Sequence, residues 1–363
     1  MHMSNNLLIR IFIIILVVIV AWGLFWVIIR REIVMFGFQM RLKGIILVAI
    51  SIIVLLGCGL LLTMSSWTSI EILWLILLWI IYVSRVLAPL FIVRDILSIW
   101  YKIPSCIIIG ISLLYVGFGI YKGTSIKTTQ LSISSDLITK EYKIVFISDI
   151  HVEAIHNRWY VQSIVHHIQE THPDIVLIGG DLMNTAKLAY VEAFLPFNQL
   201  KMPVYAIAGN HDHMGNTGAL LQIFETTKIL PLGEKSIAID GIQIVGIDDK
   251  SYRGNKKLPE ILKESSIVES GQFTILVSHE PEKLSKLTGY PINLELAGHT
   301  HNGQFFPINR LIKPFVDYTY GEYHLNNMIA FVSQWIGSWW APIRIGTQSE
   351  LVLISLKPKY IKN

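Results

Sequence analysis

The sequence of 363 residues predicts an α/β domain in residues 124–363, preceded by an all-α region of four transmembrane helices in residues 1–123. Ile, Leu, Val and Trp dominate the first region, and its Lys and Arg residues fall mostly in short gaps between apolar runs. In the second region, short apolar runs of strand length alternate with amphipathic stretches of helical spacing. Because the composition changes so sharply near residue 123, the overall mean hydropathy of +0.52 averages over two unlike regions.

Four apolar stretches in the first region have the length of about 20 residues that a helix needs to cross a bilayer. They are roughly residues 11–29, 44–64, 72–93 and 103–121. The first is longer than the apolar core of a cleavable signal peptide, about 7 to 15 residues, and it leads into Arg30 and Arg31 instead of a small-residue cleavage site. We therefore expect it to be retained as the first of four spans.

Positive charges between the spans predict the orientation in the membrane. The first and third gaps carry Lys and Arg, whereas the second gap, Ser65 to Glu71, carries neither. Because short cytoplasmic loops are enriched in Lys and Arg, we expect a multi-pass protein of the cell membrane whose C-terminal domain is extracytoplasmic. Arg85 lies within the third span, where snorkelling to the cytoplasmic interface is favoured over a contact with a lipid head group.

Charge and cysteine content exclude several classes of partner and site. The first 123 residues contain nine Lys or Arg and three acids, so the rest contains 21 and 23. That balance leaves no basic excess for binding nucleic acid, and nothing indicates an obligate protein partner. Both cysteines, Cys58 and Cys106, lie in apolar stretches, which excludes a disulfide or a cysteine-ligated metal in the C-terminal domain.

Five short apolar runs after residue 123 predict strands, and a helix is predicted at 159–170. The strands are expected at 143–147, 175–178, 204–207, 274–277 and 294–297. Clusters of Asp, Asn or His follow these strands: Asp149 with His151, Asp181 after two glycines, Gly209-Asn210-His211-Asp212, His279, and Gly298-His299-Thr300-His301. Loops at strand ends let such side chains converge without disturbing a sheet.

The residue types in these clusters suit Mn²⁺, Fe or Zn²⁺. Taken singly, an Asp-x-His or Gly-Gly-Asp segment is more often an ordinary turn. Five of the 12 histidines fall in the clusters, however, and each cluster directly follows an apolar run, so a site with two metal ions is the simplest interpretation. The histidines at 156, 166, 167 and 172 are expected to be solvated or capping, and His213 could line the rim of the site.

In this order the clusters resemble the calcineurin-like metallophosphoesterases, whose pattern is DxH, GD, GNHD or GNHE, a lone His, and GHxH. The longer AGHTHNGQ at 297–304, followed later by an apolar strand and Pro342-Ile343-Arg344, is similar to the bacterial membrane-associated branch. The resemblance covers about residues 140–358. It implies a four-layer α+β sandwich, in which two β-sheets pack face to face with helices outside.

The resemblance also implies a role for each matching residue. Asp149, His151 and His301 would hold one divalent ion, Asp181 would bridge the two ions, and Asn210, His279 and His299 would hold the other. The ions would be Mn²⁺, Fe²⁺/Fe³⁺ or Zn²⁺. His211 would be the catalytic histidine, and Asp212 would orient it.

These roles predict hydrolysis of a phosphate ester or anhydride at the membrane surface, by in-line attack of metal-bound hydroxide with His211 as general acid. The substrate is expected to be a phosphorylated small molecule or lipid, such as a lipid-linked or cell-envelope intermediate. The alternatives are a broad phosphodiesterase or nucleotide pyrophosphatase acting on soluble substrates. A non-catalytic metal-binding sensor or a transporter is disfavoured, because the ligand set is complete and the spans contain few ionisable residues.

Three tryptophans, Trp335, Trp339 and Trp340, precede Pro342. Core packing and contact with the bilayer are both open, because Trp is favoured at membrane interfaces.

Overall fold

The structure, a computed structural model, describes most of the chain after residue 104. The described residues are 105–153, 156–253, 258–264, 271–304, 306, 308–311, 313–314, 316–338 and 342–359. Internal contacts divide the chain into two units, Met1–Leu114 and Tyr115–Asn363. The boundary expected at residue 123 stays a prediction.

The first three expected spans, together with Arg85, lie outside the described residues. Helix α4, Ser105–Thr124, covers most of the fourth expected span. Within the part of the chain that the structure describes, no helix combines the length and the hydropathy needed to cross a membrane.

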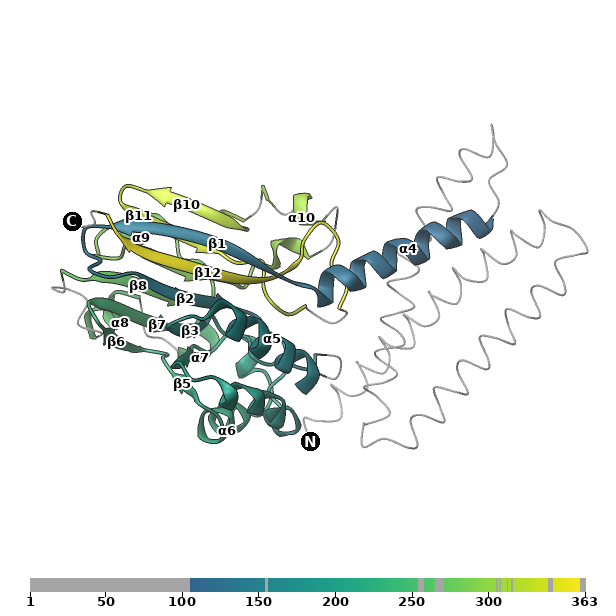
Figure 1. The fold of residues 1–363 in the computed structure, drawn as a ribbon, viewed down its shortest axis with the longest axis horizontal. Helices are drawn as coiled ribbons and strands as arrows, with labels where there is room; N and C mark the ends of the chain where they lie inside the picture. Colours follow the sequence, from purple (N-terminus) through teal and green to yellow (C-terminus); the bar gives the residue numbers. More distant parts are fainter. Residues whose placement is uncertain are drawn as a thin grey trace, which may run out of the picture. The chain divides into compact units, whose positions relative to one another are not determined.

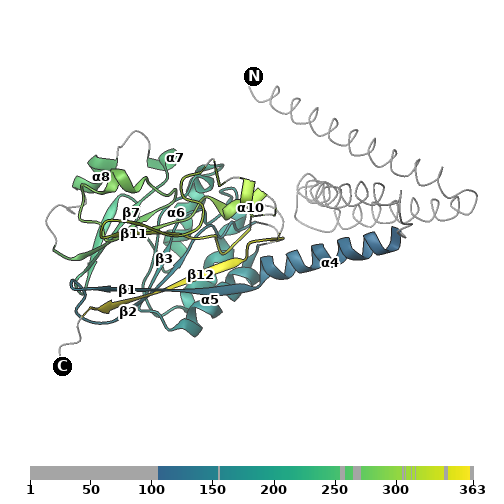
Figure 2. The ribbon, with the colours of Figure 1, turned by 90° about the horizontal axis from the view of Figure 1, so that it is seen from above.

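The first β-sheet has six strands in the order β1-β12-β2-β3-β4-β5. Strands β2 to β5 run parallel, β12 is antiparallel to β2, and β1 pairs in parallel with β12. Figure 2 shows α4 leading into β1, which lies beside β12. The bounds are β1 Ile126–Ser135, β2 Tyr142–Ile147, β3 Ile175–Ile178, β4 Val204–Ala206, β5 Ile229–Pro231 and β12 Ser349–Pro358.

The second β-sheet also has six strands, in the order β10-β11-β9-β8-β7-β6. Its four central strands are parallel, and β6 and β10 pair antiparallel at the two edges. The bounds are β6 Lys235–Ile239, β7 Ile242–Ile247, β8 Phe273–Ser278, β9 Leu294–Ala297, β10 Gly321–Leu325 and β11 Met328–Val332. Both sheets are therefore mixed, with parallel strands next to the site described below.

Apolar side chains of the two sheets pack against each other in one buried cluster, which includes Phe146 and Leu177 from the first sheet and Ile275 and Leu296 from the second. Helices cover the outer faces (Figure 1). Those on the first sheet are α5 Arg158–Thr171, the 3₁₀ segment η2 Leu188–Gln199 and α6 Gly218–Thr226; those on the second are α8 Leu258–Glu264 and α9 Leu284–Leu287. Two mixed sheets flanked by helices confirm the predicted α/β class and its layered arrangement.

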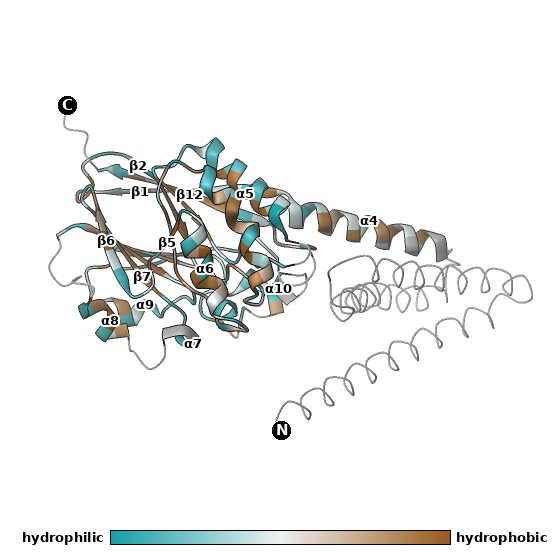
Figure 3. Cartoon of the chain, turned by 90° about the horizontal axis from the view of Figure 1, so that it is seen from below, coloured by the Kyte–Doolittle hydropathy of each residue, from teal (hydrophilic) through white to brown (hydrophobic). Residues whose placement is uncertain are grey.

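Helix α5 shows why a sequence segment adopts its place in these layers. Asn157 caps its first turn by accepting a hydrogen bond from the Trp159 N–H, and His172 ends it in the left-handed conformation, with φ of 47°. Its apolar residues recur at helical spacing and are buried, whereas its other face is polar, as the colouring in Figure 3 shows. The helix therefore buries one stripe against the first sheet.

Candidate metal centre

The loops after β2, β3 and β4 leave the first sheet at the same level. Ile147 pairs with Ile178, and Ile178 with Ala206, so these parallel strands end side by side. The loops are also joined directly, because the Asp149 N–H donates to Gly180 O at 3.0 Å. In the second sheet, the Gly298 N–H donates to His279 O at 3.0 Å, which joins the loops after β8 and β9.

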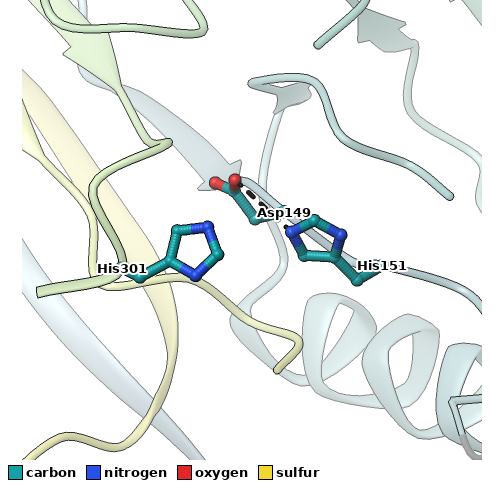
Figure 4. Close-up of side chains that lie close together, drawn as sticks. All are labelled: Asp149, His151 and His301. Carbon is teal, nitrogen blue, oxygen red and sulfur yellow. Dashed lines mark ion pairs between the residues drawn. The ribbon is translucent and has the colours of Figure 1, made fainter. Parts of the chain in front are cut away.

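Two groups of side chains in these loops could each hold a metal ion. In the first ligand group, Asp149, His151 and His301, the ligand atoms all lie within 4.8 Å of one another (Figure 4). In the second ligand group, Asp149, Asp181 and His279, the same limit holds. The first group is the set that the sequence predicted for one ion, and Asp149 additionally joins the second.

Asp181 lies between the two groups. Its Oδ2 is 3.6 Å from His151 Nε2 and 3.4 Å from His279 Nε2, which is the position expected of a bridging carboxylate. Asn210 and His299 adjoin the second group, because Asn210 Oδ1 is 3.0 Å and His299 Nδ1 3.1 Å from His279 Nε2. All seven residues predicted as ligands are thus gathered in one connected cluster.

Several buried polar atoms in the cluster have no hydrogen-bond partner among the described residues. They are Asp149 Oδ1, Asp181 Oδ2 and both ring nitrogens of His151. All three side chains are fully buried, and a buried polar atom that lacks a hydrogen bond is destabilising. Carboxylate and imidazole groups in this arrangement suit first-row divalent ions. The residues present therefore fit a metal centre.

Electrostatics in the cluster favour the protonation states that ligands need, except at two positions. Burial alone would raise the pKa of Asp181, but the neighbouring imidazoles, His279 above all, lower it well below its usual value. Burial lowers the pKa of His151 to about 3, so this ring is neutral. The two exceptions are Asp149 and His279. Burial raises the pKa of Asp149 to about 7. Burial alone would lower the pKa of His279, but the charge of Asp181 raises this pKa to about 10. Cation binding would release protons from these two groups.

Five of the seven predicted ligands have a left-handed backbone. The φ angles are 57° at Asp149, 49° at His151, 51° at Asp181, 66° at His299 and 62° at His301. Non-glycine residues adopt this region rarely, and such strain concentrates at functional sites, where the surrounding structure enforces it. The loops are therefore shaped for the placement of these side chains and not for relaxed local geometry.

Two glycines of the motifs are needed for close approach. A Cβ added at Gly209 would collide with the Asp181 carboxylate, and one at Gly298 would collide with the Asp149 carboxylate and the Ser148 hydroxyl. The glycines of GNHD and GHTH therefore make room for ligands that belong to other strands.

His211 is half-buried beside the cluster, with its ring centroid 4.9 Å from that of His151. Its backbone N–H donates to Asp181 Oδ1 at 2.8 Å, and its Nδ1 lies 2.7 Å from Asn184 O. A carbonyl can only accept a hydrogen bond, so Nδ1 carries the proton and donates. That leaves Nε2 as the ring nitrogen able to exchange a proton with a bound molecule.

Asp212 is buried next to His211, and its carboxylate binds backbone groups. It accepts hydrogen bonds from the N–H groups of Leu182, Met183 and Gly209 at 3.2, 3.1 and 2.9 Å. Asp212 therefore ties the loop after β3 to the loop after β4. The hydrogen bond that orients the His211 ring is donated to the backbone carbonyl of Asn184. Because every residue has such a carbonyl, the sequence could not predict this contact.

Trp335 is a further neighbour of the cluster that sequence reasoning did not connect with it. The side chain is fully buried, with its ring centroid 5.3 Å from that of His151. Core packing is thus the correct interpretation for Trp335, and contact with the bilayer is wrong for it. Trp339 and Trp340 lie outside the described residues.

The other histidines mostly follow expectation. His172 caps α5, and His166 is exposed, with its Nε2 3.3 Å from the Glu170 carboxylate. His156 was expected to be solvated or capping, which is wrong: it is buried, its Nε2 lies 3.0 Å from Ser338 Oγ, and its ring packs on Tyr160.

Two mixed sheets with carboxylates and histidines gathered at their strand ends define the class of proteins that bind metal ions at the end of a layered α/β fold. Residues 142–303 match the family described as calcineurin-like phosphoesterase. A Helicobacter pylori protein named "Uncharacterized metallophosphoesterase" is 33% identical over 261 residues, which are 69% of this chain and 70% of that protein. The chain belongs to the calcineurin-like metallophosphoesterases.

Other relatives extend the comparison. A Bacillus subtilis protein named "Uncharacterized metallophosphoesterase YkuE" is 31% identical over 251 residues, covering 64% of this chain and 86% of that protein. A Bos taurus protein named "Transmembrane protein with metallophosphoesterase domain" is 30% identical over 243 residues, covering 59% of this chain and 53% of that protein.

Proposed function

We propose that this metallophosphoesterase holds two divalent cations and hydrolyses a phosphate ester or anhydride at a membrane surface. Asp149, His151 and His301 would hold one cation, Asp181 would bridge, and Asn210, His279 and His299 would hold the other. The observation that carries this proposal is that Asp149 Oδ1 and Asp181 Oδ2 are buried in the cluster with no hydrogen-bond partner among the described residues. Such atoms are stable in a protein interior when a cation satisfies them.

When bound, two divalent cations supply an activated water and neutralise the phosphoryl oxygens as charge develops on them. The chain's own residues provide the proton chemistry. His211 Nδ1 donates to Asn184 O, so Nε2 is the nitrogen left for the leaving oxygen, and the doubly protonated ring can give its Nε2 proton to that oxygen. Asp212 positions His211 through the backbone, because it binds the N–H of Gly209 in the same loop.

A lipid-linked or cell-envelope phosphate is the proposed substrate, acted on from the extracytoplasmic side. Support comes from the four apolar stretches before residue 123, from the charge pattern between them, and from the name of the bovine relative. Helix α4 also exposes large apolar side chains, including Ile111, Leu114 and Phe118. A catalytic domain attached at the bilayer meets substrates confined there at high effective concentration.

Activity of the metal-loaded protein on a substrate panel tests this proposal. The full-length chain, purified in detergent and loaded with Mn²⁺, is assayed on phospholipids, lipid-linked phosphates, nucleotides and soluble model diesters. Preference for the lipid-linked compounds is expected. Hydrolysis of soluble diesters or nucleotide anhydrides alone would show a phosphodiesterase or pyrophosphatase of soluble substrates, and metal binding without any hydrolysis would show a sensor. Reporter fusions at residue 123 and at the C-terminus test the orientation.

A further inference from the structure

The segment Ser333–Ser338, here called the Trp335 loop, follows β11 and forms one wall of the candidate metal centre. Trp335 is fully buried, and its ring packs against the ring of His151, with the ring centroids 5.3 Å apart. His151 belongs to the first ligand group. The Trp335 loop lies outside residues 142–303, which match the family, so the match itself assigns it no role.

His151 depends on packing for its orientation. A metal-binding histidine usually donates its second ring N–H to a carboxylate or carbonyl, which fixes the tautomer and the ring plane. His279 has such a bond, from Nδ1 to Gly179 O at 2.8 Å. Among the described residues, neither ring nitrogen of His151 has a hydrogen-bond partner, so its ring is held by the aromatic rings around it, Trp335 and His211.

The Trp335 loop is held in a strained conformation by bonds on two sides. Trp335 has φ of 79°, a region that a bulky residue adopts only under constraint. On one side the buried Glu350 accepts from the Gln334 N–H at 3.0 Å, and its own N–H donates to Trp335 O at 2.7 Å. On the other side the Gly337 N–H donates to Asp149 O at 3.0 Å. The loop is therefore bonded to the segment that carries a ligand.

Arg344 binds the Trp335 loop through its guanidinium group. Its guanidinium is fully buried and lies over the Trp335 ring, with Cζ 5.4 Å from the centroid. It donates to Gln334 O at 2.8 Å and to Gly337 O at 2.6 and 3.1 Å, the carbonyls that flank Trp335. A third carbonyl, Gln348 O, accepts at 2.6 Å. A buried guanidinium with only carbonyl partners is destabilising because its charge is removed from water. Here the hydrogen bonds of Arg344 fix the position of the Trp335 ring.

We propose that Trp335 is a positioning residue that orients His151 for metal binding, and that Arg344 holds Trp335 in that position. The inference rests on the proposed two-metal centre and deepens it, because it predicts that the two ions depend on different supports. The ion held by the first ligand group depends on the Trp335 loop. The ion held by His279 and its neighbours does not.

Cobalt titration of the full-length chain in detergent tests the inference. Metal-free protein is titrated with Co²⁺, and the affinities and the visible absorption of the bound ions are measured. Trp335→Ala is expected to weaken one of two binding steps by about 10- to 100-fold and to change that ion's absorption, with the other step unchanged. Trp335→Phe, which keeps an aromatic face, should restore wild-type affinity. Arg344→Lys keeps the charge but loses the fork of donors, so it should weaken the same step less.

Phe194→Ala is the matched control, because Phe194 is also a fully buried aromatic side chain but belongs to η2 and packs in the helix-covered core of the first sheet. It should lower the melting temperature and leave both cobalt affinities unchanged. Wild-type affinities and absorption in Trp335→Ala, or an equal loss in Phe194→Ala, would overturn the inference. If Trp335→Ala does not fold, Trp335→Leu and Arg344→Lys decide by the same criteria. A wild-type protein that binds no cobalt overturns the proposed function instead.

Discussion

The two sides of the candidate metal centre are built by different means. On the side of His279, directional hydrogen bonds orient the ligand: its ring bonds to Gly179 O, and the preceding Ser278 hydroxyl donates to the buried Glu295 at 2.9 Å. On the side of His151, aromatic packing takes that place. The difference teaches that one dinuclear site can have two kinds of support, which should respond differently to substitution.

Asp181→Asn should produce the largest effect, because Asp181 lies between the two sides and serves both. We expect loss of both ions and of several kcal/mol of transition-state stabilisation, about 10⁴-fold in kcat/KM. Metal analysis and kinetics of the full-length chain measure this. Asp240→Asn, which alters an exposed carboxylate paired with Lys140, is the control. Retention of one ion at full affinity would show that Asp181 does not bridge.

His211→Ala should leave both sides intact and remove the proton donor between them. We expect kcat to fall by about 10² to 10⁴-fold while the metal content stays at the wild-type level. His166→Ala, on the exposed face of α5, is the control. Loss of metal together with activity would make His211 a ligand and contradict its role as general acid.

Gly298→Ala should act on both sides through Asp149, which belongs to both ligand groups. The added methyl group collides with the Asp149 carboxylate, so the affinity for each ion should fall by about 10- to 100-fold. Gly289→Ala is the matched control, because a Cβ there meets no atom within 4 Å. Wild-type affinity for both ions in Gly298→Ala would contradict the role of Asp149 as a ligand.

The buried Glu295, on the side of His279, should make the stability of the protein depend on pH. Replacing it should have the smallest effect on activity of the changes considered. Burial, aided by the charge of Glu282, raises its pKa from 4.5 to about 7, although hydrogen bonds from Glu282 N–H and Ser278 oppose the shift. The folded state thus keeps a proton that the unfolded state releases. The resulting stability is complete below pH 4.5 and is lost as pH rises through 7, a change of about 3 kcal/mol.

Glu295→Gln stays neutral at every pH and should lack this loss. Urea unfolding of both proteins at pH 4.5 and pH 8 measures it, since taking the difference between them cancels the other titrating groups. A wild-type protein that gains stability relative to the variant as pH rises would contradict the shift.

Much of this fold and site follows from the sequence because the central strands are buried on both faces. The run Ile175–Ile178 is continuously apolar, and Leu294–Ala297 is apolar except for the buried Glu295; the structure has strands with the same bounds. The predicted ligands directly follow such runs, and the structure gathers them in one cluster. The match to the family then supports the layered arrangement that the motifs implied.

The strands and neighbours that were missed depend on tertiary contacts. Edge strands β6 and β10 alternate half-buried and exposed residues, a pattern with little apolar signal, and β1 becomes a strand through its pairing with β12. Asn184 acts through its backbone carbonyl, which every residue has. Trp335 could be assigned to the core only once the segment around it was placed, because a tryptophan suits a bilayer surface equally well.

The place of β12 has a consequence for synthesis on the ribosome. This last strand lies between β1 and β2, and the Ser349 hydroxyl donates to Gly123 O across 226 residues. The chain segment after α4 therefore emerges early but has no neighbour in its sheet until nearly the whole domain has been translated. Such non-local pairing forms slowly, so the nascent protein carries an open sheet edge on which chaperones or other chains can act before the final strand closes it.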